Sequence, residues 1–370
     1  MRLIVVGGGV TGAACAYTAA GLGAEVVLVD ADLPGQATAA GAGIICPWSS
    51  HVDDQVWYAF ACAAARDYPA LVAELTEAAG GDPAAVSYRK VGALMLTRDG
   101  DEAVRECERL RAQVAATPEM GEVRVIGAAE ASELFPPLRP GSAAVYVGGA
   151  ARVDGRRLRE ALISAARARG ATVITGRAEL TARAGRVTGV EVGGQVLPGD
   201  AVVAAAGAWT AALVAPLGLA VRVTPQRGQI VHLRLQGTDT SRWPVVLPAW
   251  SGHYLLAFDD SRVVAGATRE TGSGFDPRVT AGGVEEVLTR ALDVAPGLAA
   301  ATHLETRVGL RPAGPDFRPL LGPGGAEGLV VATGLGAVGL TLGPLAGSVA
   351  ARTALGVHQP FDLTPFDPLR

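Results

Sequence analysis

The sequence has little lysine and little cysteine. Lys90 is the only lysine in 370 residues, so the chain lacks the lysine of a P-loop and has at most one residue for a Schiff base. The four cysteines, Cys15, Cys46, Cys62 and Cys107, show no spacing typical of a metal or redox site, and we expect no bound metal. This pattern favours free thiols in a reducing cytoplasm over a disulfide.

Histidine is also sparse. Five histidines are scattered without the spacing of metal ligands and without a serine and acid relay. They are His51, His232, His253, His303 and His358. Only His253, beside Tyr254, is close in sequence to a candidate pocket residue, and packing is favoured over catalysis for it.

Charge is sparse as well. The formal net charge is −4 and no basic cluster is long enough to follow a phosphate backbone, which argues against nucleic acid as a partner. Residues 3–24 and 328–351 carry no charge, and they superficially suit a signal peptide and a membrane span. Glycines divide both stretches, so we interpret them as buried parts of a soluble α/β protein without a transmembrane segment.

A glycine-rich turn between a strand and a helix lies at the beginning of the chain. An apolar strand runs into Gly7-Gly8-Gly9-Val10-Thr11-Gly12, and an alanine-rich helix and a second strand ending in Asp30 follow. Gly7 permits the tight turn, Gly9 lets backbone N–H groups approach a pyrophosphate, and Gly12 lets the helix pack closely. Asp30 follows Gly12 by 18 residues, about where a ribose-binding carboxylate is expected. The pattern predicts a dinucleotide site, with a plain strand-turn-helix as the alternative.

Segments of the same kind recur in the middle and at the end of the chain. Residues 202–207 are a buried strand meeting glycine, and residues 329–332 lead through a glycine loop into a helix over 341–355. Between them, residues 221–267 are rich in predicted strands, and glycines near 185 and 193 indicate a hairpin. We therefore predict an α/β fold with a discontinuous Rossmann-like domain (1–85, 146–222 and 306–370) and an inserted antiparallel β-sheet substrate domain (86–145 and 223–305).

Six segments, in this order, resemble the FAD-dependent amine oxidoreductases that include D-amino acid oxidase, D-amino acid dehydrogenase, glycine oxidase and sarcosine oxidase. Among these four, the chain looks more like glycine oxidase and D-amino acid dehydrogenase. The segments are residues 5–12, 39–43, 203–209, 225–229, 309–312 with 315–316, and 333–336 with 339–342.

The resemblance implies FAD as the cofactor and distinguishes it from NAD. It places the pyrophosphate at residues 7–12, the ribose at Asp30, and the isoalloxazine ring against residues 40–45 and 334–340. The small residues from Thr38 to Ile45 would let backbone approach the ring, whereas composition alone allows a flexible loop. The residues expected to contact FAD are Gly7, Gly9, Val10, Thr11, Gly12, Asp30, Ala31, Thr38, Ala40, Gly41, Gly43, Ile44, Ala206, Gly207, Trp209, Arg311, Gly334, Gly336, Ala337, Val338, Gly339, Leu340 and Thr341.

The resemblance also implies four substrate-site residues. Arg311 matches the arginine that pairs with the substrate carboxylate, and Tyr254 matches the tyrosine that helps to hold it. Arg269 is either a second carboxylate partner or a charge at the rim, and Trp48 either walls the pocket or packs in the core. A structural role is the alternative for Arg311 and Tyr254.

Two departures from the family pattern refine this prediction. Glycine oxidase has a second arginine where this chain has Ala337, so carboxylate binding rests on Arg311 alone or includes Arg269. No cysteine follows Cys107, so we expect a non-covalent flavin. Lys90 lies outside the flavin motifs, which disfavours the sarcosine oxidase branch.

The implied reaction is oxidation of a D-amino acid or glycine-like substrate by hydride transfer from Cα to flavin N5, followed by hydrolysis of the imino acid. Oxygen, a quinone or a partner subunit is the electron acceptor. A secondary amine such as sarcosine or proline is an alternative substrate. From another class, an NAD-dependent dehydrogenase or a non-catalytic nucleotide-binding module stays open, as does a homo-oligomer.

Overall fold

A six-stranded sheet joins segments from the beginning, the middle and the end of the chain. The computed structural model describes residues 1–370, and this sheet has the order β20-β21-β13-β1-β2-β9. Its strands are β1 (Arg2–Val6), β2 (Glu25–Asp30), β9 (Thr172–Thr175), β13 (Ala201–Ala204), β20 (Leu320–Pro323) and β21 (Leu329–Thr333). All neighbours are parallel except β20 and β21. Leu3, Ile4 and Val5 are fully buried, because helices and strands cover both faces of β1.

Helices α1 (Val10–Gly21), α6 (Gly155–Ala168) and α9 (Gly339–Ala354) pack together beside this sheet, with α1 in contact with both others. Glycine permits the close approach of α1 and α9, since a Cβ on Gly347 would lie 2.2 Å from the Thr11 carbonyl oxygen. Helix α3 (Gln55–Ala78) also packs on α9. It begins after Asp54, whose carboxylate accepts a hydrogen bond from the Trp57 N–H at 3.0 Å.

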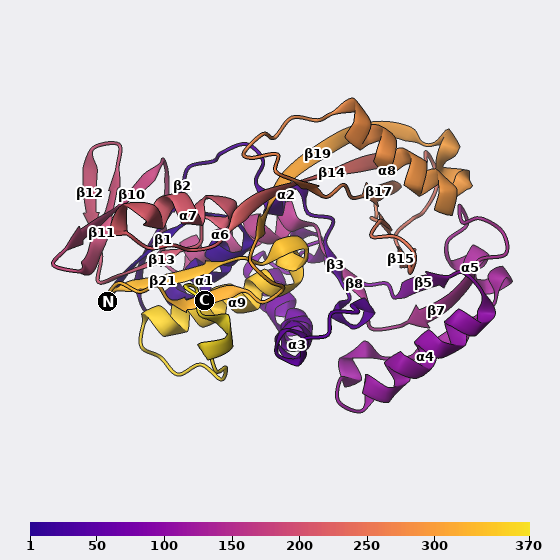
Figure 1. Cartoon of the computed structure of the whole chain (residues 1–370), viewed down its shortest axis with the longest axis horizontal. Helices are drawn as coiled ribbons and strands as arrows, with labels where there is room; N and C mark the ends of the chain where they lie inside the picture. The colour runs from indigo at the N-terminus through magenta and orange to yellow at the C-terminus, as the bar shows by residue number, and fades with distance from the viewer.

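A second, larger sheet lies at the end of the molecule away from the two termini (Figure 1). Strand β14 (Thr224–Arg234) pairs antiparallel with β17 (Arg262–Gly266), β18 (Glu270–Thr271) and β19 (Thr302–Ala313). The sheet continues through β16 (Tyr254–Ala257), β15 (Val245–Pro248), β5 (Ala93–Thr97), β7 (Ala143–Val147) and β6 (Val123–Ile126). Helix α8 (Ala281–Val294) covers β14 and β17, and α4 (Gly100–Val114) covers β6 and β7.

The remaining elements are short. They are the sheet of β10 (Ala178–Arg183), β11 (Arg186–Val192) and β12 (Gln195–Pro198); the sheet of β3 (Ile44–Ile45), β8 (Ala151–Arg152) and β4 (Arg89–Lys90); the helices α2 (Ala37–Ala40), α5 (Ala128–Leu134) and α7 (Thr210–Val214); and 3₁₀ turns at Pro47–Ser49, Pro83–Ala85, Pro118–Met120, Gly207–Trp209, Ala215–Leu217, Pro296–Ala300, Gly336–Val338 and Thr364–Phe366.

The predicted fold class is confirmed, with three differences in detail. The inserted sheet is antiparallel except for the parallel pair β15–β5. The predicted hairpin near residues 185 and 193 is a three-stranded sheet, because both turns join strands. The small-residue run at 38–45 is largely ordered as α2 and β3 rather than as a loop. The proposed domain boundaries stay a prediction.

The two charge-free stretches form buried elements. Residues 3–24 contain β1 and α1, and residues 328–351 contain β21 and most of α9. None of the helices combines the length and the apolar character that crossing a membrane requires.

Buried arginines connect α6 to the larger sheet. Arg262 on β17 pairs with Asp154, the N-cap of α6, at 3.0 Å, and its guanidinium lies 4.2 Å from the centre of the Phe258 ring. Arg152 on β8 pairs with Asp259 and packs over the same ring at 4.9 Å. His232 on β14 lies against Arg262, with 3.4 Å between Nδ1 and the guanidinium.

His232 predicts acid sensitivity of the fold. Burial, then Arg307 and Arg262, lower the pKa of His232 from 6.5 to about 3. Below about pH 6.5 the unfolded chain therefore binds a proton that the native imidazole does not, and stability falls as the pH falls toward 3. Relative to His232→Gln, the parent should lose up to about 1.4 kcal/mol of unfolding free energy per pH unit below about pH 6. Urea denaturation at several pH values measures this difference, and a pH-independent difference would contradict the assignment.

Candidate active site

One large cavity extends from the six-stranded sheet to the larger sheet. Its volume is about 1340 Å³, and 73 residues line it, from Gly7 after β1 to Arg311 on β19. It includes residues at the carboxyl ends of β1, β2, β13 and β21, where open α/β sheets bind their ligands. Pockets for drug-sized ligands have volumes of about 300–1000 Å³, so this cavity has room for a dinucleotide and a small substrate.

The N-terminus of α1 meets the cavity. Gly9 is the N-cap residue and has no side chain to cap the helix, and the first turn has no acidic residue. The Val10 N–H donates to the Thr38 hydroxyl at 3.0 Å, while the N–H groups of Thr11 and Gly12 belong to the first turn, which lacks intrahelical acceptors. Free N–H groups and the positive end of the helix dipole suit a phosphate.

Asp30 ends β2 beside the glycine-rich turn. Its Oδ1 accepts the Asp32 N–H at 3.0 Å, and its Oδ2 accepts a hydrogen bond from Arg159 at 2.9 Å. A Cβ on Gly8 would lie 2.3 Å from Oδ2, so the absence of a side chain there lets the carboxylate approach the turn. The Arg159 Nε also donates to the Gly8 carbonyl at 2.5 Å, a contact that the sequence did not predict because 151 residues separate the two.

Two loops complete the cavity at the ends of β13 and β21. Gly207 and Gly334 have φ of +55° and +72°, the left-handed region that favours glycine. The Thr333 hydroxyl donates to the Gly207 carbonyl at 2.8 Å and joins these loops. On the far side, the Thr341 hydroxyl donates to the Ile44 carbonyl at 3.0 Å, which ties the start of α9 to β3.

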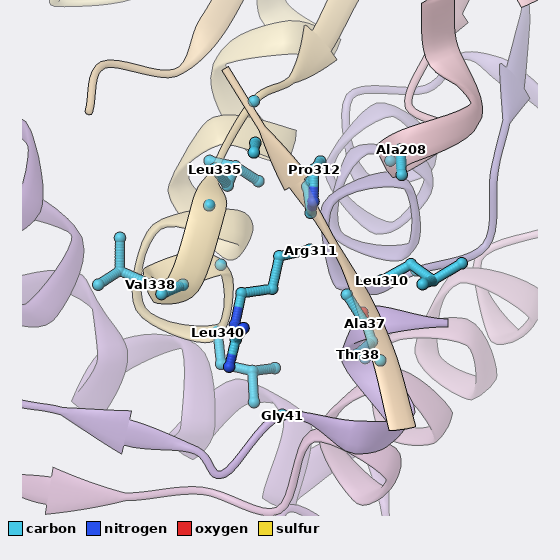
Figure 2. Close-up of a pocket in the computed structure, with 18 of the residues that line it drawn as sticks. Ala37, Thr38, Gly41, Ala208, Leu310, Arg311, Pro312, Leu335, Val338 and Leu340 are labelled. Atoms are coloured by element: carbon cyan, nitrogen blue, oxygen red, sulfur yellow. The ribbon is translucent and has the colours of Figure 1, made fainter. Parts of the chain in front are cut away.

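Arg311, Tyr254 and Arg269 line the opposite part of the cavity. Arg311 Nη1 donates to the Thr268 carbonyl at 2.9 Å and to the Arg227 carbonyl at 3.5 Å, but Arg311 forms no ion pair. Burial lowers the pKa of Arg311; Tyr254 opposes this shift and Arg269 adds to it. Figure 2 shows the Arg311 side chain projecting from β19 toward the turn that carries Val338 and Leu340.

Tyr254 and Arg269 lie close enough to Arg311 to shift its pKa, and both arginines shift the pKa of Tyr254. Burial raises the pKa of Tyr254 to about 12, and the positive charges of Arg311 and Arg269 limit the rise. The phenol therefore stays protonated near neutral pH and can donate a hydrogen bond. Arg269 is exposed and forms neither an ion pair nor a hydrogen bond within the protein.

Every predicted cofactor and substrate residue except Gly12 and Trp48 lines the cavity. Gly12 lies behind it, where a Cβ would be 1.8 Å from the Gly7 carbonyl oxygen, in agreement with a packing role. Trp48 is 1 % exposed in the core, and its neighbours Pro47 and Ser49 line the cavity instead. Of the two roles expected for Trp48, packing in the core is the one that agrees with its position.

His253 lies near the pocket, as its position beside Tyr254 indicated. It lines the cavity, its Nδ1 lies 3.1 Å from the Ser251 hydroxyl, and its Nε2 lies 3.2 Å from a Glu286 carboxylate oxygen. Burial lowers the pKa of His253, opposed by Glu286. The Glu286 contact was not apparent in the sequence, because α8 brings this residue from a distant segment.

Sequence reasoning missed the segment Gly176–Leu180, which lines the cavity after β9. The Gly176 N–H donates to the Asp30 carbonyl at 2.8 Å, so the segment adjoins the ribose-binding candidate. Its position at the carboxyl end of a strand next to β2 was the available signal. Met95, Leu247 and Ile230 were also missed, since nothing in an apolar strand marks which residues face a ligand.

Comparison with known proteins identifies the family. The sequence profile described as "DAO: FAD dependent oxidoreductase" matches residues 2–353. The chain belongs to this family. It is an FAD-dependent oxidoreductase, and FAD is its cofactor.

Several relatives match over nearly the whole chain. The uncharacterized oxidoreductase YurR of Bacillus subtilis (strain 168) is 45% identical, covering 99% of this chain and 98% of the relative. Glycine oxidase of Pseudomonas putida (strain KT2440) is 31% identical, with the same coverage of each. The crystal structure of iminodiacetate oxidase (IdaA) from Chelativorans sp. BNC1 has a TM-score of 0.95 and 46% identity, covering 99% of both chains.

The residues present fit FAD. The N-terminus of α1 would hold the pyrophosphate, Asp30 the ribose, and the small residues at 40–44 and 334–340 would let backbone approach the flavin ring. A Cβ on Gly9 would approach only the Thr38 hydroxyl, at 3.2 Å, which leaves open space in front of this glycine.

Gly12→Ala should weaken FAD binding. The added Cβ would lie 1.8 Å from the Gly7 carbonyl oxygen, so the phosphate-binding turn must shift. We expect a loss of about tenfold or more in FAD affinity, measured by flavin fluorescence during titration of the apoprotein. Gly282→Ala is the matched control, because a Cβ there meets nothing within 4 Å. Equal affinities for the two variants would contradict the packing role.

Proposed function

We propose that this protein oxidises a small amine that carries a carboxylate on the carbon next to nitrogen. One observation carries the proposal: two guanidinium groups without acidic partners, Arg311 and Arg269, line the same cavity as the Tyr254 hydroxyl. A guanidinium presents a planar fork that matches a carboxylate, and a protonated phenol adds a donor.

In this proposal the residues of the chain bind and orient the substrate. Arg311 and Tyr254 hold the carboxylate, and the apolar walls at Met95, Leu247 and Ile230 exclude water from the reacting carbon. FAD, when bound, accepts the hydride. Orientation of two reactants can contribute about 7–11 kcal/mol at best, so no side-chain base is needed for the scheme. The amine reacts as the free base.

A secondary amine with two carboxylates is the substrate class that we favour. Arg269 supplies a second guanidinium near Arg311 that is free of protein partners, which suits a second carboxylate. The similarity to iminodiacetate oxidase, at 46% identity over 99% of each chain, supports this choice. The sequence alone favoured a D-amino acid or glycine as the substrate and a secondary amine as the alternative. Our proposal reverses this order.

Glycine or a small D-amino acid is the second candidate. The 31% identity to glycine oxidase of Pseudomonas putida favours it, and so does the single Arg311–Tyr254 pair, which is sufficient for one carboxylate. Ala337 occupies the position where the family resemblance implies a second arginine in glycine oxidase. Whether Arg269 binds a second carboxylate therefore distinguishes the two candidate substrates.

The cysteines bear on how the flavin is attached, and the relatives bear on the electron acceptor. Cys46 is the only cysteine in the cavity, and burial raises the pKa of its thiol to about 11, which disfavours a reactive thiolate. We therefore propose a non-covalent flavin. Oxygen is the electron acceptor that we propose, since two relatives that match over nearly their whole length are named glycine oxidase and iminodiacetate oxidase. A quinone or a partner subunit is the alternative acceptor.

Arg311→Lys should weaken substrate binding while FAD stays bound. Lysine keeps the positive charge but loses the two-pronged geometry, so we expect KM for iminodiacetate or glycine to rise by about 10- to 100-fold. Oxygen uptake measures the kinetics, and visible absorption measures the FAD content. Arg98→Lys, at a surface ion pair with Glu102, is the matched control. An unchanged KM in Arg311→Lys would remove Arg311 from its proposed role.

Arg269→Gln should separate the two substrate candidates. If Arg269 binds a second carboxylate, KM for iminodiacetate rises by about tenfold while KM for glycine changes by less than about twofold. Glutarate replaces the amine of iminodiacetate by a methylene, so its dissociation constant reports carboxylate binding without oxidation. Equal effects on both substrates, or no weakening of glutarate, would refute the dicarboxylate assignment.

A further inference from the structure

The segment Pro225–Gln229 has no role in the proposed reaction, although it is one of the six family segments. It lies on β14, where Gln226 is the register partner of Arg311 on β19. Arg227 and Gln229 both direct their side chains to Glu270 on the neighbouring strand β18. The same Glu270 also contacts Thr268, whose carbonyl oxygen accepts the hydrogen bond from Arg311.

We propose that Glu270 is a positioning residue that fixes the Arg311 guanidinium through Thr268, and that Arg227 and Gln229 hold Glu270 for this purpose. The inference rests on the proposed role of Arg311 in binding carboxylate. It deepens that role by identifying what holds the guanidinium in place and leaves it free for substrate.

Four donors saturate the Glu270 carboxylate. Arg227 donates to Oε2 through Nε at 2.8 Å and through Nη2 at 2.6 Å. Oε1 accepts from the Gln229 amide at 2.8 Å and from the Thr268 hydroxyl at 2.7 Å. Burial raises the pKa of Glu270, but the hydrogen bonds from Gln229, Arg227 and Thr268 outweigh burial and lower it. Glu270 is therefore ionised at neutral pH, and its lone pairs are occupied.

Thr268 connects Glu270 to Arg311. Its hydroxyl is fixed twice, because it donates to Glu270 and accepts the Gln229 backbone N–H at 2.9 Å. Its own N–H donates to the Gln229 carbonyl at 3.2 Å. With both the hydroxyl and the N–H of this fully buried residue held, its carbonyl oxygen is a rigid acceptor for Arg311 Nη1 at 2.9 Å.

Gln229 anchors the network to a helix. Its Oε1 accepts the Thr280 N–H at 3.0 Å, and its Nε2 donates to the Thr280 hydroxyl at 2.8 Å as well as to Glu270. Thr280 is the N-cap of α8. Gly283 leaves room for this fully buried amide, since a Cβ there would lie 2.1 Å from Nε2. The orientation of the amide is thus fixed by its three partners.

The arrangement keeps a negative charge near Arg311 without placing it against the guanidinium. A carboxylate in direct contact would compete with the substrate carboxylate for the same donors. A neutral carbonyl holds Nη1 instead, and the remaining N–H groups stay available for the substrate. A buried charge without any partner would be costly, and the indirect attraction to Glu270 offsets part of that cost.

Two pairs of variants test the inference. Thr268→Val keeps the shape but removes the hydroxyl, whereas Thr268→Ser keeps the hydroxyl. Glu270→Gln removes the charge and places an amide N–H group among donors. Its control, Asp293→Asn, removes a carboxylate from an exposed ion pair at the end of α8. FAD content and melting temperature are measured for each variant, to confirm that the holoenzyme is intact.

Thr268→Val and Glu270→Gln should raise KM and the glutarate dissociation constant by about tenfold, with kcat changed by less than about threefold. Thr268→Ser and Asp293→Asn should stay within about twofold of the parent. A purely structural role would lower FAD content and kcat without this selective effect on KM, and that result would overturn the inference. Unchanged glutarate binding in Glu270→Gln would also overturn it.

The test separates this inference from the proposed function. If Arg311→Lys raises KM but Thr268→Val and Glu270→Gln do not, Arg311 binds substrate and the positioning network is wrong. If Arg311→Lys leaves KM unchanged, the carboxylate role fails and the inference fails with it.

Discussion

A guanidinium held inside the protein without a carboxylate partner is the constraint on which the rest of the structure depends. Burial disfavours the charged form of Arg311, yet the residue forms no ion pair. The backbone carbonyls of Thr268 and Arg227 accept hydrogen bonds from the guanidinium. Glu270, which is not in direct contact, and the Tyr254 phenol also favour its charged form. Each of these needs a rigid support, which the long pairing of β14 with β19 provides. The larger sheet thus supports the carboxylate site that we propose.

The cofactor half of the site follows from short-range geometry. Gly7, Gly9 and Gly12 lie within six residues of one another, and Asp30 follows at the end of the next parallel strand. The strand, turn, helix and second strand of this motif follow one another in the sequence, so residue type and spacing were enough to predict its shape. The fold class was predictable for the same reason, because buried parallel strands have an apolar pattern that does not depend on distant partners. The contacts of Arg159 with Gly8 and Asp30 come from a distant segment and could not be predicted in this way.

The substrate half depends on pairings that no local pattern encodes. Arg311 meets Thr268 because β19 pairs with β14 in one register and β14 also pairs with β17 and β18, between which Thr268 lies. A shift of β19 by one residue would turn Arg311 to the other face. The family resemblance located Arg311 and Tyr254, but it could not show the contact of His253 with Glu286. The sequence left the role of Trp48 open for a related reason: in the turn at Pro47–Ser49 the adjacent residues line the cavity while the indole packs in the core.

The two sheets share one apolar core, which includes Leu3 and Val5 on β1 as well as Ile230 and Val264 on the larger sheet, and a few further contacts join them. Arg262 reaches Asp154 at the start of α6, and Gly309 on β19 packs against the α2 segment beside Thr38. Thr38 in turn receives the Val10 N–H at the terminus that would hold phosphate. The strand that carries Arg311 is therefore connected to the glycine-rich turn through Gly309, the α2 segment and Thr38. In the function that we propose, this common support would hold the substrate carboxylate and the flavin at a fixed separation, which hydride transfer requires.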